Sequence, residues 1–151
     1  MTMKIYLTHC SAEKDNALKG TNIATTPDKL YTNPELQAFM QRCLHQRVAW
    51  AILSDRYGVW FPDVKHEWYE KHPATVTELE AQQIVAQFDR DLQGYDEIYF
   101  FVWAETFHPF YQTVLSATKL AGRVTQFSDL QMIRAAAGDG EQRAQAKAPL
   151  A

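Results

Sequence analysis

The sequence has few cysteines and no long apolar run, and each shortage excludes a class of protein. Its 151 residues include 2 cysteines, Cys10 and Cys43, which form neither a Cys-x-x-Cys motif nor a disulfide framework. We therefore expect a reducing, cytoplasmic location. No segment approaches the roughly 18 apolar residues of a spanning helix, and the first residues lack the apolar core of a signal peptide. These features predict no membrane partner.

An excess of basic residues is also missing. Lysine and arginine number 15 against 18 aspartate and glutamate residues, which gives a net charge of −3. Binding of nucleic acid through phosphates is therefore possible but not favoured by charge. Neither glycine-rich nucleotide fingerprint occurs, and no histidine or cysteine pair has zinc-ligand spacing, so we expect no cofactor and no metal site.

What the chain does contain is a series of apolar runs that alternate with amphipathic segments. We predict strands over 4–10, 48–53, 98–104 and, shorter, 124–127, and no regular element over 54–73. Because the longer runs are apolar at consecutive positions, both faces of the sheet should be covered by helices. The prediction is an α/β fold, a Rossmann-like three-layer sandwich with a mostly parallel sheet of about four strands.

Helix starts are signalled by capping residues. Asn33-Pro34, the capping box from Thr77 to Glu80, and His108-Pro109 each begin a predicted helix. The buried stripes of the first two include Leu44 and Leu79. We expect the third helix to run through Leu120 with Gly122 as its C-cap residue, and a last helix to run from Ser128-Asp129 to about Ala137.

All 4 Trp, 7 Tyr and 8 Phe lie before Arg134. Beyond that point the composition is alanine, glutamine, glycine and charge, which is typical of disorder. We therefore predict one domain over 1–133 and a disordered tail over 134–151.

Polar residues follow three predicted strands, and parallel strands present their carboxyl ends at one edge of the sheet, where ligands bind. Glu105 is the candidate acid or base and Cys10 the candidate nucleophile. Purely structural roles stay open for both residues, because Cys10 also suits a small buried apolar position and Glu105 a helix cap or an ion pair. The candidate ligand-binding residues at the first two strand ends are Ser11, Lys14, Ser54, Tyr57 and Gly58.

Large aromatic residues are concentrated after the second strand. Tyr57, Trp60, Phe61, Trp68 and Tyr69 lie close together in sequence. Such rings stack on a nucleobase or a sugar, but they also pin a loop to the core or form a dimer contact.

Several of these residues form motifs that resemble known families. Cys10-Ser11-x-x-Lys14, then Leu30-Tyr31, then Leu53-Ser54-x-x-Tyr57-Gly58 with a later Pro62 and Tyr69 look like the pattern of an uncharacterised microbial and phage domain family. The Leu-Ser-x-x-Tyr-Gly block also resembles the YaaA peroxide-stress proteins, which are associated with DNA binding and protection of DNA from oxidation. The resemblance spans about 4–69. It implies a Rossmann-like domain with a pocket at the first two strand ends, and it adds Tyr31 and Tyr69 to the candidate ligand-binding residues.

Three functions fit these observations. The leading hypothesis is a small cytoplasmic protein that binds a nucleobase-, nucleoside- or nucleotide-like ligand at the carboxyl edge of the sheet, with or without hydrolysis. One alternative is a non-enzymatic, DNA-associated or stress-response factor like the YaaA proteins. Another is a protein-interaction module that uses the aromatic loop. The sequence decides neither between enzyme and binding protein nor on the oligomeric state.

Overall fold

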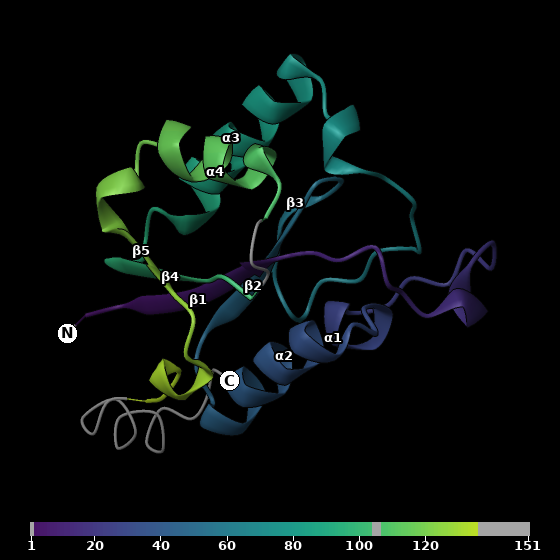
Figure 1. Ribbon diagram of the computed structural model, residues 1–151, viewed down its shortest axis with the longest axis horizontal. Coiled ribbons are helices and arrows are strands. Elements are labelled where there is room, and N and C mark those ends of the chain that lie inside the picture. The colour runs from purple at the N-terminus through teal and green to yellow at the C-terminus, as the bar shows by residue number, and fades with distance from the viewer. Residues whose placement is uncertain (1, 104–106, 136–151) are drawn as a thin grey trace.

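The sheet is built from β1 (Lys4–His9), β2 (Trp50–Ser54), β3 (Gly58–Trp60), β4 (Glu97–Phe101) and β5 (Val124–Phe127). The computed structural model describes residues 2–103 and 107–135 of the chain (Figure 1). The strands lie in the order β3-β2-β1-β4-β5. β1 pairs in parallel with β2 and β4, β4 pairs in parallel with β5, and β3 runs antiparallel to β2.

Helices cover both faces of this sheet. The helices are α1 (Pro27–Leu30), α2 (Pro34–Gln46), α3 (Glu78–Leu92) and α4 (Pro109–Ala117). α1 and α2 lie on one side of the sheet, and α3 and α4 lie on the other (Figure 1). The prediction of an α/β fold with a mostly parallel sheet is therefore confirmed. Within the described part of the chain, no helix is long and apolar enough to cross a bilayer.

The predicted helix starts are confirmed, and each is held by a side chain that accepts backbone donors. Asn33 accepts from the amides of Glu35 and Leu36 at the start of α2. Thr77 and Glu80 form the capping box of α3, in which each side chain accepts the other residue's backbone amide. Such caps satisfy amides that have no partner within the helix, so local sequence alone determines where these helices begin.

β1 is the centre of the core because it has a strand on each side and helices above and below. Ile5 and Leu7 are fully buried on one face of the strand. On the opposite face the buried Thr8 hydroxyl donates a 2.7 Å hydrogen bond to the carbonyl of Phe101 in β4, which satisfies a polar group that water cannot reach.

One strand was missed by sequence reasoning. β3 lies inside 54–73, where we expected no regular element, and it is only 3 residues long. Alternation cannot be recognised over so short a segment. Its first residue, Gly58, has φ +70°, and the side chain of Gln87 from α3 occupies the space that a Cβ would fill. The Gln87 amide accepts from Val59 N and donates to the carbonyls of Tyr57 and Val59.

The predicted buried faces of α2 and α3 each include one residue that is exposed. Leu44 is 46% exposed and Leu79 is 63% exposed, although both were expected to be buried. Leu79 stands five positions from Ile84, which places it about 140° around α3 from the buried stripe. Leu44 lies in the last turn of α2, one position beyond the buried Cys43.

Two helix ends also differ from the predictions. α4 ends at Ala117 with Thr118 as its cap, and Gly122 lies instead in a separate 3₁₀ turn, Ala121–Arg123. The expected last helix is a single 3₁₀ turn, Leu130–Met132, capped by Asp129. A single turn of 3 residues is too short to show helical periodicity, so the sequence did not distinguish it from a longer helix. Most of the predicted tail lies outside the described residues.

Replacing Gly58 tests the contact with α3. Gly58→Ala should lower the free energy of unfolding by about 1–3 kcal/mol, because a side chain at this φ is strained and displaces the Gln87 amide. Urea denaturation measures the change. The control is Gly122→Ala, which meets no atom within 4 Å and should stay within about 0.5 kcal/mol of the wild type. Equal effects of the two substitutions would contradict this account of Gly58.

Candidate functional site

A thiol and a carboxyl group meet where β1 and β2 end. Cys10 directly follows β1 and Asp55 directly follows β2, and the amide of Cys10 donates to the carbonyl of Leu53 at 3.1 Å. This pairing places Cys10 Sγ 3.6 Å from Asp55 Oδ1, to which the thiol donates. Tyr111 reaches the same sulfur from α4, with its hydroxyl 3.2 Å away. The exposed fractions of Cys10 and Asp55 are only 7% and 2%.

A network of hydroxyl groups adjoins this pair. The hydroxyls of Tyr31 and Tyr69 lie 2.6 Å apart, and Ser54 Oγ donates to the Tyr69 hydroxyl at 3.2 Å. Ser54 also accepts from the amides of Arg56 and Tyr57, both at 3.0 Å, so it turns the chain at the end of β2. Both the turn-forming and the site-forming interpretations of Ser54 therefore have a contact that supports them.

Lys14 completes this buried cluster. It forms an isolated antiparallel bridge with Tyr31 and is only 8% exposed. Its Nζ lies 4.3 Å from the centre of the Tyr69 ring and 5.9 Å from the rings of Tyr31 and Trp68. We call Cys10, Lys14, Tyr31, Ser54, Asp55, Tyr69 and Tyr111 the strand-end cluster.

Burial shifts the ionisable groups of the strand-end cluster toward their neutral forms. Loss of solvent raises the pKa of the Cys10 thiol and of the Asp55 carboxyl group. The same cause lowers the pKa of the Lys14 amine, although the charges of Cys10 and Asp55 partly oppose it. Shifts of this kind gather at sites where acids, bases and nucleophiles act, so the cluster is a candidate for chemistry.

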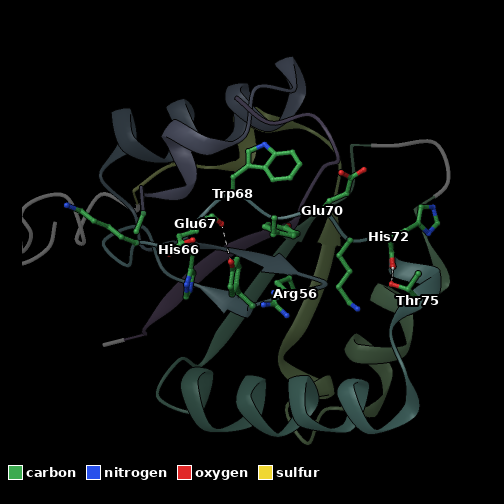
Figure 2. Close-up of a pocket in the computed structure, with 12 residues that line it drawn as sticks. Arg56, His66, Glu67, Trp68, Glu70, His72 and Thr75 are labelled. Atoms are coloured by element: carbon green, nitrogen blue, oxygen red, sulfur yellow. Dashed lines mark hydrogen bonds between the residues drawn. The ribbon is translucent and has the colours of Figure 1, made fainter. Parts of the chain in front are cut away.

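An open groove of about 870 Å³ lies beside the strand-end cluster (Figure 2). Tyr69 belongs to both, because its hydroxyl is in the buried network while the residue lines the groove. The segment after β3 contributes most of the lining. The residues around the groove are Ala24, Arg56, Tyr57, Lys65, His66, Glu67, Trp68, Tyr69, Glu70, Lys71, His72 and Thr75.

The aromatic residues of the groove are held in place by one another. His66 stacks on Tyr57 with ring centres 3.8 Å apart and planes 2° from parallel. The Tyr57 hydroxyl donates to the carbonyl of Glu67, and the guanidinium carbon of Arg56 lies over the Tyr57 ring, 5.6 Å from its centre. A preformed stack of this kind loses little conformational freedom when a ligand binds.

A buried histidine, His9, lies at the end of β1. His9 stacks between aromatic rings, including Trp103 at 4.7 Å and Tyr111 at 4.9 Å between ring centres. Its Nδ1 lies 2.9 Å from the carbonyl of Cys10, so Nδ1 carries the proton, and Nε2 has no partner within the described residues. Burial lowers the pKa of this imidazole.

The structure brings together most of the predicted site residues. Cys10, Lys14, Tyr31, Ser54 and Tyr69 are in the strand-end cluster, and Tyr57 lines the groove.

Three predicted residues are placed elsewhere. Gly58 opens β3 and packs against Gln87. The hydroxyl of Ser11 accepts from the amide of Glu13 in a local turn. Glu105, the predicted acid or base, lies outside the described residues.

Sequence reasoning missed Asp55, Tyr111 and His9. Asp55 was available, because it immediately follows Ser54 at a predicted strand end. Tyr111 was assigned to the apolar stripe of its helix, which is where its ring lies, and nothing local shows that its hydroxyl reaches a thiol 101 positions away. His9 is part of a strand whose pattern predicts only burial.

Two of the proposed alternatives depend on exposed side chains. Trp60 is fully buried, so it adds nothing to an interaction surface, and Trp68 is half-buried. Among the basic residues of the first half of the chain, Lys14 is buried, and Arg42 donates to the carbonyls of Gln131 and Ile133.

No family model, curated protein or solved structure matches this chain. In the described ranges, no three histidine, cysteine or acidic side chains are grouped to hold a metal ion.

The His9 environment predicts a pH-dependent stability. The pKa of His9 lies below its ordinary value of 6.5, so the unfolded chain binds a proton at pH values where the folded chain does not. The free energy of unfolding should therefore be highest above this value and fall below it, by at most about 1.4 kcal/mol per pH unit for one histidine. Urea denaturation between pH 5 and 8 measures the slope.

Two variants test whether His9 causes this pH dependence of the free energy of unfolding. His9→Phe removes this titrating ring and should reduce the slope, whatever it does to the absolute stability; the slope that remains includes the contribution of His66, whose pKa burial also lowers. Phe107→Leu weakens the same stack, whose ring centres are 5.5 Å apart, without removing a titrating group. It should keep the wild-type slope. An unchanged slope in His9→Phe would contradict the assignment.

Proposed function

We propose that this protein binds a small ligand that combines an aromatic ring with an anionic group, of the nucleobase, nucleoside or nucleotide type, in the groove at the carboxyl edge of its sheet. We also infer a Rossmann-like relationship for the fold, since ligands of such sheets bind at this edge. The observation that carries the proposal is the groove itself, which places aromatic rings and cationic side chains around one open space of about 870 Å³.

The aromatic part of the groove suits a planar ring. Trp68 is half-buried, and the stacked pair of His66 and Tyr57 forms a rigid platform. Stacking of a base on an aromatic side chain contributes about 1–3 kcal/mol and tolerates different bases. The groove therefore supports recognition of a ring system without fixing which base it carries.

The charged part of the groove suits an anion. Arg56 and Lys65 are exposed at the groove, and Lys71 forms a 3.4 Å ion pair with Glu80. The carboxylates of Glu67 and Glu70 are also present, so the positive field is moderate. A chain with net charge −3 nevertheless presents one arginine and two lysines at this one groove. A single phosphate group is a better match than a polyphosphate or a nucleic-acid backbone.

Titration with a panel of ligands tests the proposal. Isothermal calorimetry with AMP, GMP, CMP, UMP, the matching nucleosides and inorganic phosphate should show tighter binding of the monophosphates than of either part alone. The ring and the phosphate each contribute contacts, so neither fragment should reproduce the affinity. Absence of binding by every compound at millimolar concentration would overturn the proposal.

Substitutions at the groove locate the binding. Arg56→Gln and Lys65→Gln should each weaken monophosphate binding by about tenfold, because a hydrogen bond to a charged group contributes about 1.5 kcal/mol or more. Neither should change nucleoside binding. Trp68→Leu should weaken binding of both. The matched control is Lys119→Gln, an exposed lysine that does not line the groove. Equal losses in this control would place the site elsewhere.

A further inference from the structure

We infer that Lys14 is a reactive amine that forms an imine with an aldehyde or ketone group of a bound ligand. The inference rests on the proposed function, because the groove supplies the ring and anion contacts that would hold such a ligand. It goes further by assigning a covalent chemistry and a substrate class, an aromatic or anionic carbonyl compound, to a residue behind the groove wall.

The surroundings of Lys14 are unusual for a lysine. Its side chain is 8% exposed, and within the described residues no carboxylate lies at ion-pair distance from Nζ. Its hydrogen bond to the carbonyl of Ala12 is long, at 3.5 Å. Lysine is almost never this buried without a charged partner, because the ammonium group loses its hydration.

Aromatic rings take the place of that partner. Nζ lies over the Tyr69 ring at 4.3 Å from its centre, and the ring centre of Trp68 is 5.9 Å away. Both residues line the groove and Lys14 does not, so the amine contacts the groove wall from behind, at these two rings. These rings attract the ammonium form but do not restore its lost hydration, and burial lowers the pKa of the Lys14 amine.

The electrostatic balance around the amine points the same way. Burial lowers the pKa of Lys14, and the opposing charges are those of Cys10, Asp55 and Glu70. Burial raises the pKa of the Cys10 thiol, so this group is uncharged at neutral pH and does not hold the proton on the amine. The fraction of neutral amine at Lys14 therefore exceeds that of an exposed lysine, and desolvated lysines of this kind are the ones that form imines in proteins.

The step balances without an oxidant or a reductant. The lone pair of neutral Nζ attacks the carbonyl carbon, the carbon–oxygen double bond becomes a single bond, and one proton moves from nitrogen to oxygen. The resulting carbinolamine is protonated on its hydroxyl group, loses water and forms the carbon–nitrogen double bond. We assign the donation and recovery of this proton to Asp55, the carboxyl group of the cluster that interacts electrostatically with Lys14. One amine and one carbonyl compound thus give one imine and one water.

Reductive trapping tests the inference on the full-length protein. The probe is pyridoxal 5′-phosphate, used as an anionic aromatic aldehyde at less than one equivalent, followed by sodium borohydride and peptide mass spectrometry. Hydride addition makes the imine a stable secondary amine. We expect the adduct on Lys14 to exceed that on any exposed lysine, and its formation to persist to lower pH.

Matched variants make the result specific. Lys14→Arg keeps the charge but forms no imine under these conditions, and it should lose the Lys14 adduct while its melting temperature confirms folding. Lys119→Arg should leave labelling of Lys14 unchanged. Labelling spread over the exposed lysines, or concentrated on Lys65 or Lys71 with Lys14 unmodified, would overturn the inference.

Competition with AMP separates this inference from the proposed function. Protection of Lys14 by AMP supports both. If AMP binds at the groove but Lys14 is not labelled, the imine is overturned and the ligand-binding function stands. If Lys14 is labelled while no nucleotide binds or protects it, the reactive amine stands and the nucleotide-like ligand is overturned.

Discussion

The parallel pairing of β1 with β2 is the constraint on which the site depends. The register that matches His9 with Leu53 ends both strands at the same edge of the sheet and fixes Cys10 beside Asp55. A shift by one residue would turn each of these side chains to the opposite face. The apolar residues of the two strands stabilise this register through burial on both faces, so the core of the fold and the geometry of its candidate site have the same cause.

Desolvation then determines what the strand-end cluster can do. Its acid, thiol and amine share a space from which water is largely excluded, and each is shifted toward the neutral form. Charged forms are costly in such surroundings, so each of these groups gives up or takes up a proton at a pH different from that of its exposed counterpart. The groove beside them is wetter and more charged. Tyr69 connects the two environments, with its hydroxyl in one and its ring at the boundary of the other.

The sequence predicted those parts of the fold that local chemistry determines. Caps at Asn33 and Thr77 and the apolar runs of the parallel strands are local signals, and strand ends identified Cys10, Lys14 and Ser54 as neighbours. What it missed depends on contacts between distant segments. β3 packs against α3 through Gly58 and Gln87, and Tyr111 joins the cluster because its hydroxyl reaches from α4 to Cys10. Neither contact can be recognised from the order of neighbouring residues in the sequence.

The Gln87 side chain has a consequence beyond the placement of β3. β3 is an edge strand, and the backbone amide and carbonyl of Val59 that point away from β2 are both occupied by the Gln87 amide. An exposed edge with free amides and carbonyls is a template on which further strands add, in dimers and in aggregates. One glutamine on α3 therefore closes this end of the sheet to strand addition, and it leaves β5 as the edge at which such growth could begin.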